Sequence, residues 1–156
     1  HQVWYPMVEN GDADIAECKK RFRALKNEYI RHHFWHTVFS DREMRHALRK
    51  GRALLRQAAF RRLQVSVGRA NHPAEGRQTP FSGTVILHAQ HAVAACCRKC
   101  IEYWHGIPAG EALDQGELAY LHELVMLYIA ARLPDLPDGP TKVPRHAQRM
   151  GTTSGH

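Results

Sequence analysis

Long apolar runs are missing from this sequence. No stretch approaches the roughly 18 consecutive apolar residues that a membrane-spanning helix needs, so we expect no transmembrane segment. The first twelve residues, HQVWYPMVENGD, lack the basic-then-apolar order of a secretory signal peptide. We also find no internal repeat, so nothing indicates an array of similar units.

Cysteine is scarce and does not form the pattern of a disulfide scaffold. The chain has 4 cysteines in 156 residues, and two of them are adjacent. This favours a reduced cytoplasmic protein over a small secreted one. The length and the 44% hydrophobic content are those of one ordinary globular domain with a core of its own.

Acidic residues are few in the first half of the chain. Residues 1–77 carry 16 Lys and Arg against 8 Asp and Glu, whereas residues 78–156 carry 6 against 7. The net charge of +7 therefore belongs to the N-terminal half. Such an asymmetry indicates a polyanionic partner, and we expect nucleic acid, ahead of a membrane.

The apolar spacing predicts helices and no convincing strand. Apolar residues three and four apart predict a helix from Asp12 or Asp14 to about residue 36. Ser40 and Glu43 form the pattern of a capping box at the start of a second helix. Residues 115–132 are apolar on most sides, which predicts a largely buried helix. Residues 85–89 form a short strand in the alternative interpretation.

We therefore predict an all-α compact bundle of four to five helices. A single domain covers residues 1–133, with a long central helix through residues 84–105. Residues 134–156 are rich in proline and have no periodicity, which predicts a flexible tail or a segment that docks on something else.

Five arginines recur three and four positions apart along the second predicted helix. On a straight helix they form a stripe about 21 Å long, with acid on the same face only near its start. We predict that the stripe contacts phosphates, which fix position without reading sequence; an acidic protein surface is the alternative partner. Three further polar contacts, Arg77, Gln78 and His91, are expected near the start of the central helix. The stripe consists of Arg42, Arg45, Arg49, Arg52 and Arg56.

The central stretch, residues 76–110, holds three of the four cysteines and supports two interpretations. In the first, Cys97 and Cys100 form a C-x2-C pair that binds zinc together with His91 and His105. In the second, residues 84–105 form one continuous helix and the cysteines are core. The two histidines would then lie about 21 Å apart, so a shared ion requires the helix to break near residues 94–96.

Three other chemistries use the same kinds of residue. An iron–sulfur cluster would need all four cysteines, including the distant Cys18. A cysteine nucleophile could be activated by His91 or His105. The histidines of RHHFWH, residues 31–36, could bind metal or stack on bases, although helix-end histidines beside core aromatics are commoner.

Several short motifs of the central stretch resemble an uncharacterised bacterial family, domain of unknown function 4186. They are GRQTP (76–80), AQHA (89–92), CCRKC (96–100) and WHGIPAG (104–110). The resemblance is specific over residues 76–110 and weaker over residues 40–132, and the segments before 40 and after 134 look like additions. The family has Gly-His-Pro where this chain has Gly83-Thr84-Val85. The resemblance implies a compact helical domain and no particular reaction.

The sequence thus predicts a basic, helical nucleic-acid-binding protein, a subunit of a ribonucleoprotein or mobile-element complex that is not itself an enzyme. The alternatives are a small zinc- or cysteine-dependent enzyme acting on nucleotides or nucleic acid, and a structural subunit that binds an acidic protein surface.

Overall fold

The computed structural model describes residues 11–26, 28–70 and 77–143. Within these ranges the chain forms six α-helices and no strand, which confirms the all-α prediction. The residues considered as a strand lie in a helix. The helices are α1 (Gly11–Lys26), α2 (Tyr29–His36), α3 (Asp41–Val67), α4 (Val85–Ala92), α5 (Arg98–His105) and α6 (Gln115–Arg132).

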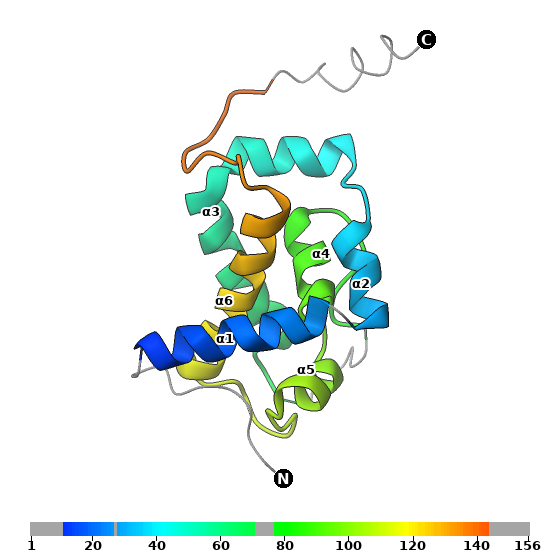
Figure 1. Cartoon of the computed structure of the whole chain (residues 1–156), viewed down its shortest axis with the longest axis vertical. Coiled ribbons are helices and arrows are strands. Elements are labelled where there is room, and N and C mark those ends of the chain that lie inside the picture. Colours follow the sequence, from blue (N-terminus) through cyan, green and yellow to red (C-terminus); the bar gives the residue numbers. More distant parts are fainter. Residues whose placement is uncertain (1–10, 27, 71–76, 144–156) are drawn as a thin grey trace.

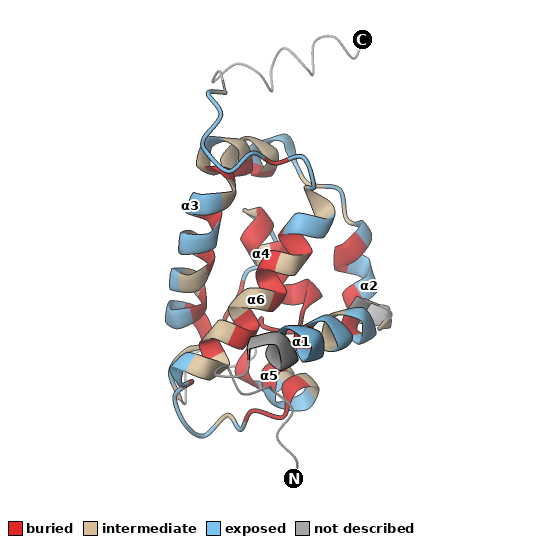
Figure 2. Ribbon diagram, turned by 60° about the vertical axis from the view of Figure 1, so that its left-hand side comes forward, coloured by how far each residue is buried: buried red, intermediate tan, exposed pale blue. Residues whose placement is uncertain are grey.

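Helix α6 occupies the centre of the bundle (Figure 1). It packs against α1, α3 and α4, and the burial-coloured view shows it among other buried segments (Figure 2). Leu121, Leu124 and Val125 are fully shielded from solvent, as its nearly uniform apolar character predicts. None of the described helices is long and apolar enough to cross a membrane.

The predicted long central helix is wrong, because residues 84–105 form two short helices, α4 and α5, with a break between them. The first predicted helix is also divided, into α1 and α2. Since α2 is a separate element, it packs against α4. The far end of α2 is tied to α6, because the Tyr128 hydroxyl and the Arg132 guanidinium both donate to the carbonyl of Phe34, at 2.7 and 2.9 Å.

Helix α3 begins as predicted. The backbone N–H of Glu43 donates to the Ser40 hydroxyl at 3.1 Å, and the backbone N–H of Ser40 donates to the Glu43 carboxylate at 2.9 Å. The helix is then kinked at Gly51, whose φ of 75° lies in the left-handed region.

A segment from the end of the described chain closes this kink. The C-terminal strap, residues 134–143, accepts hydrogen bonds from the backbone N–H groups of Arg52 and Ala53 through Pro137 and Asp138, at 2.8 and 3.0 Å. It also returns a bond, from Thr141 N–H to the Leu48 carbonyl at 2.7 Å. The docking alternative therefore holds for residues 134–143, and residues 144–156 lie outside the described residues.

The kink divides the arginine stripe, because the two parts of α3 run in different directions (Figure 1). Arg52 turns onto the strap, where it donates to the Leu136 carbonyl at 3.0 Å and lies 3.7 Å from the Asp138 carboxylate. Arg45 is half-buried and has a contact within the chain. The prediction of one continuous row of five is therefore wrong, and Arg42, Arg49 and Arg56 remain as exposed members.

Gly51 is expected to tolerate no side chain. In Gly51→Ala, the added Cβ would overlap the Gly139 carbonyl oxygen and lie 2.7 Å from that of Asp138. The left-handed backbone alone costs a non-glycine residue about 1–3 kcal/mol, so urea denaturation is expected to show at least that loss. Gly110→Ala is the control, because a Cβ there meets nothing within 4 Å. Equal stability of the two variants would contradict the role given to the kink.

Candidate metal centre and adjoining pocket

The site is built around the break between α4 and α5. The chain leaves α4 at Val93, passes through Ala94 with a φ of 59°, and reaches Cys97 in an extended conformation, with φ −156° and ψ 165°. Among the described residues Ala94 is the one non-glycine residue with positive φ. An alanine gains nothing locally from this conformation, so contacts from elsewhere must hold the break.

Buried polar side chains supply those contacts, because they bond the backbone groups that a continuous helix would have satisfied internally. Thr79 donates to the Cys96 carbonyl at 2.7 Å, and Gln90 donates to the Ala95 carbonyl at 3.0 Å. The remaining bonds are Arg31 to the His91 carbonyl, His105 to the Val93 carbonyl, and Arg98 N–H to the Gln78 side-chain oxygen.

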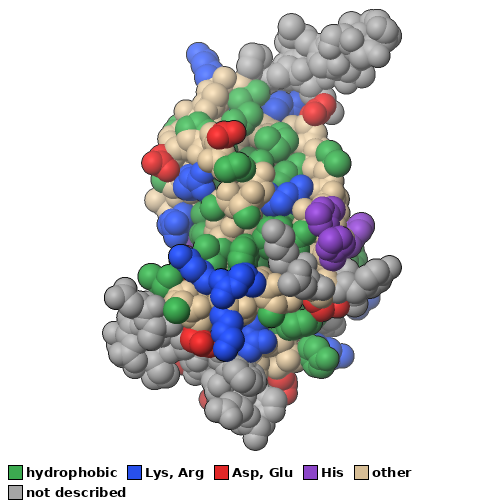
Figure 3. All heavy atoms as spheres, in the orientation of Figure 1, with side chains coloured by type: hydrophobic (Ala, Val, Ile, Leu, Met, Phe, Trp, Pro, Cys, Tyr) green, Lys and Arg blue, Asp and Glu red, His purple; other side chains and the backbone are tan. Residues whose placement is uncertain are grey.

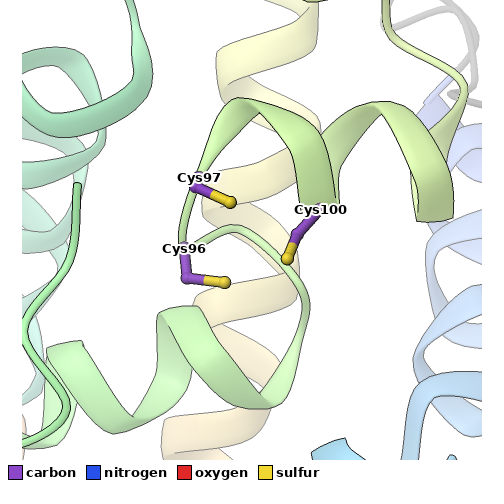
Figure 4. Close-up of side chains that lie close together, drawn as sticks. All are labelled: Cys96, Cys97 and Cys100. Carbon is purple, nitrogen blue, oxygen red and sulfur yellow. The ribbon is translucent and has the colours of Figure 1, made fainter. Parts of the chain in front are cut away.

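The break gathers three cysteines (Figure 4). The Sγ atoms of Cys96, Cys97 and Cys100 all lie within 4.8 Å of one another. For comparison, three thiolates at a tetrahedral zinc ion, with Zn–S bonds of about 2.3 Å, lie about 3.8 Å apart. Cys97 is the N-cap of α5 and its side chain makes no capping bond, so its sulfur is available to the group.

Arg31 of α2 lies against two of these sulfurs. Its guanidinium donates to Cys100 Sγ at 3.3 Å and to Cys96 Sγ at 3.8 Å. Hydrogen bonds from Cys96 and Cys97, together with the charge of Arg31, lower the pKa of the Cys100 thiol against the opposing effect of burial. The same hydrogen bond to Cys100 raises the pKa of Cys96. Ionisation within the group is therefore favoured at Cys100 over Cys96.

Two of the four predicted zinc ligands lie in this cysteine group. Cys97 and Cys100 are in the group, and Cys96, which a continuous helix would have turned away, takes a third place. His105 is not in the group, because its ring bonds the Tyr120 hydroxyl at 2.8 Å and the Val93 carbonyl at 3.0 Å. Complete burial lowers the pKa of His105 to about 3, so it is a neutral structural residue.

His91 also lies outside the cysteine group, but it lines the same cavity. Its Nε2–H donates to the carbonyls of Thr79 and Pro80, both at 3.1 Å. Burial lowers its pKa, so the ring is neutral near pH 7 and carries its lone pair on Nδ1.

A cavity of about 470 Å³ opens beside the cysteines. Its volume lies within the range of about 300–1,000 Å³ that is usual for small-molecule sites. Besides the three cysteines and Arg31, its lining consists of Phe34, Arg77, Thr79, Pro80, Phe81 and His91. Of this lining, Arg77, His91, Cys97 and Cys100 were predicted as site residues from the sequence, whereas Arg31, Cys96 and Phe81 were not.

A buried carboxylate anchors the loop that forms one wall of this cavity. Glu43 of α3 accepts hydrogen bonds from the Gly83 backbone at 2.7 Å and from His88 Nε2–H at 2.9 Å. Burial of the carboxyl group raises its pKa, but these bonds and the one from Ser40 outweigh burial and leave the pKa lowered.

Several other residues that the sequence pointed to have structural roles. Gln78 is buried, where it joins the Ser66 carbonyl to the start of α5, so it is not a surface contact. Arg98 of the CCRKC motif is fully buried and donates to the carbonyls of Arg69, Pro108 and Glu111. Cys18 is a core residue outside the cysteine group, so the four-cysteine cluster does not form.

The histidines that follow Arg31 in α2 are exposed. His32, His33 and His36 form no group of three metal-ligating atoms within the described part of the chain. The rings of His32 and His36 lie 4.1 Å apart, centroid to centroid.

Residues 19–130 match the family model described as Domain of unknown function (DUF4186). The chain belongs to the DUF4186 family. The matched range contains all three clustered cysteines and also Arg31, so the DUF4186 domain begins well before residue 40, where the sequence resemblance placed its start. It ends before the C-terminal strap. No solved structure matches the chain.

Glu43→Gln is expected to lower the free energy of unfolding by about 1.5–3 kcal/mol near neutral pH, since it removes the charge from a buried, hydrogen-bonded group. Because the folded pKa of Glu43 is lowered, its contribution is complete above the unfolded pKa of about 4.3 and is lost as the pH falls through the folded value. Urea denaturation of the wild type and of Glu43→Gln, measured from neutral pH down through the folded pKa of Glu43, tests this prediction. A difference that stays constant down to acid pH would contradict an ionised Glu43.

Proposed function

We propose that this chain binds one zinc ion through Cys96, Cys97 and Cys100, and that the ion's fourth position faces the adjoining cavity. The observation that carries the proposal is the convergence of three sulfur atoms, within 4.8 Å of one another, on the lining of that cavity. In this proposal the ion acts on a small ligand bound there.

The number of ligands favours a reactive centre over a purely structural one. Structural zinc sites are closed by four protein ligands, whereas catalytic sites use three and leave one position for water or substrate. Here three cysteine sulfurs lie together in the lining of a cavity. A zinc ion in that position acts as a Lewis acid toward a bound ligand or lowers the pKa of a bound water.

Arg31 is suited to support such an ion. A zinc ion with three thiolates carries a net charge of minus one, and the buried guanidinium at 3.3 Å from Cys100 offsets it. Hydrogen bonds from outside the ligand set also orient the ligands and tune the metal. The strained backbone at Ala94 agrees with this proposal, because such strain clusters at functional sites.

The proposal places the protein in a reducing compartment, which we take to be the cytoplasm. Thiolate ligands must stay reduced to hold zinc, and within the described residues the four cysteines form no disulfide.

Purified wild-type protein is expected to carry one equivalent of zinc, measured by elemental analysis. Replacement of Cys96, Cys97 or Cys100 by Ser is expected to reduce the zinc content to well below one half equivalent in each case, since each change removes one of three ligands. Cys18→Ala provides the matched control, because Cys18 is buried elsewhere and should leave one equivalent bound. Wild-type protein that stays zinc-free after reduction and incubation with zinc contradicts the proposal.

A second candidate function, nucleic-acid binding through phosphate contacts, is favoured by the distribution of basic residues. Figure 3 shows Lys and Arg side chains gathered over α1, where Lys19, Lys20 and Arg23 are exposed. Of the predicted stripe, Arg42, Arg49 and Arg56 are exposed and form no ion pair with an acidic residue of the described chain. An acidic protein surface is the competing partner for these residues.

The double substitution Arg49→Ala and Arg56→Ala tests this candidate. If both residues meet phosphates, the slope of log K against log salt concentration falls in magnitude by about two, as measured by fluorescence anisotropy with duplex DNA and duplex RNA. Lys99→Ala with Lys142→Ala removes the same charge from exposed positions elsewhere and should change the slope less. Equal slopes for the two double variants, or no binding at about 50 mM salt, would count against the candidate.

A further inference from the structure

The wall of the cavity carries an aromatic platform. The rings of Phe34, His91 and Phe81 are nearly parallel, with interplanar angles of 15° and 17° to His91 and 10° between the two phenylalanines. Their centroids lie 4.8 and 4.7 Å from that of His91. The first two rings are buried, but Phe81 is 72% exposed. A ring held in this orientation with most of its surface in solvent is suited to stack against another planar ring.

The same cavity is electrostatically suited to an anion. Arg31 and Arg77 line it, and no acidic side chain of the described residues does. The zinc ion of the proposed function, with its three thiolates, would add a charge of minus one, and the Glu28 carboxylate lies 3.6 Å from Arg31 Nε, so these two negative charges already offset Arg31 and the positive charge left for an anion is that of Arg77. Arg31 uses its N–H groups on the His91 carbonyl and the sulfurs, which leaves the exposed Arg77 as the guanidinium for a ligand.

We propose that this cavity binds a nucleotide, with the base stacked on Phe81 and the phosphate held by Arg77. Stacking between bases and aromatic side chains tolerates any base, since each has a π-face. Arginine is suited to phosphate because its planar fork presents two parallel N–H donors. The approach of a ligand atom to the metal rests on the proposed function, whereas the stacking and phosphate contacts do not.

An apolar protein partner fits these observations less well. Docking surfaces of that kind are contiguous apolar patches, but Phe81 is the one exposed large hydrophobic residue of the described chain that lines the cavity. The others, among them Val38, Val65 and Tyr103, do not line it. The remaining lining is a mixture of sulfur, imidazole and guanidinium groups, which suits a small polar ligand.

Isothermal titration calorimetry of the full chain with AMP, GMP, CMP and UMP tests the proposal, with adenosine and inorganic phosphate as the two halves of a ligand. At least one nucleotide is expected to bind more tightly than either half. Phe81→Ala should weaken the binding of that nucleotide by about 5- to 150-fold, which corresponds to the loss of one stacked base. Phe81→Trp should restore the wild-type affinity. Arg77→Ala should weaken the binding of nucleotides and leave the affinity for adenosine unchanged.

The zinc content of each sample separates the two proposals. Phe81→Ala and Arg77→Ala leave the three cysteines intact, so both variants should retain the metal content of the wild type. Nucleotide binding that depends on Phe81, in protein that stays zinc-free after reduction and incubation with zinc, supports the nucleotide site and contradicts the metal centre. Loss of zinc in the cysteine variants with no nucleotide bound by wild type below about 1 mM supports the metal centre alone and overturns the nucleotide site.

The source of the nucleotide is distinguished with short single strands. A trinucleotide that binds more tightly than the best mononucleotide assigns the site to the end or a flipped base of a strand. A trinucleotide that binds no better assigns it to a free nucleotide. Unchanged affinity in Phe81→Ala overturns the proposal whichever probe binds.

Discussion

The interruption of the helix at residues 93–97 is the constraint on which the site depends. A helix that continued through these residues would satisfy its own carbonyl groups and would direct its cysteines toward different neighbours. The chain instead releases those backbone groups, and side chains from α2, α4, α5 and the loop before α4 bond them. Because each of these bonds is buried, the loss of any one would remove a hydrogen bond from a backbone group that water does not reach. The sulfur cluster is thus held by backbone geometry that distant parts of the chain impose together.

This arrangement explains why so many residues that resemble catalytic groups have structural roles. His105, Gln78 and Arg98 are all buried, and the contacts described for them are mainly to backbone carbonyl groups or to a buried hydroxyl. A polar residue in a short motif therefore says little about chemistry until its partners are known. Arg31 and His91 differ from these three because both also line the cavity, where a ligand could reach them.

The sequence predicted those features whose cause is local. The capping box at Ser40 and the uniformly apolar helix at residues 115–132 depend on neighbouring residues, and both were confirmed. The break at Ala94 could not be predicted, because the alanine-rich segment contains no glycine or proline and the contacts that hold it come from residues up to 60 positions away. The omission of Cys96 followed from that error. The approach of Arg31 was missed for the same reason, since it requires the division of α1 from α2. The glycine at position 51 was visible, but its φ depends on a strap more than 80 residues later.

The strap affects the order in which the fold can form during synthesis of the chain. Arg52 and Ala53 are made early in synthesis, yet the carbonyl groups that accept from their amides belong to Pro137 and Asp138. Until those residues emerge from the ribosome, the two backbone N–H groups at the bend in α3 can donate hydrogen bonds only to water. The family match ends at residue 130, so the acceptors also lie outside the matched region. The angle between the two parts of α3, and with it the position of Glu43 at the cavity wall, is thus settled last, by a piece of chain outside the matched region.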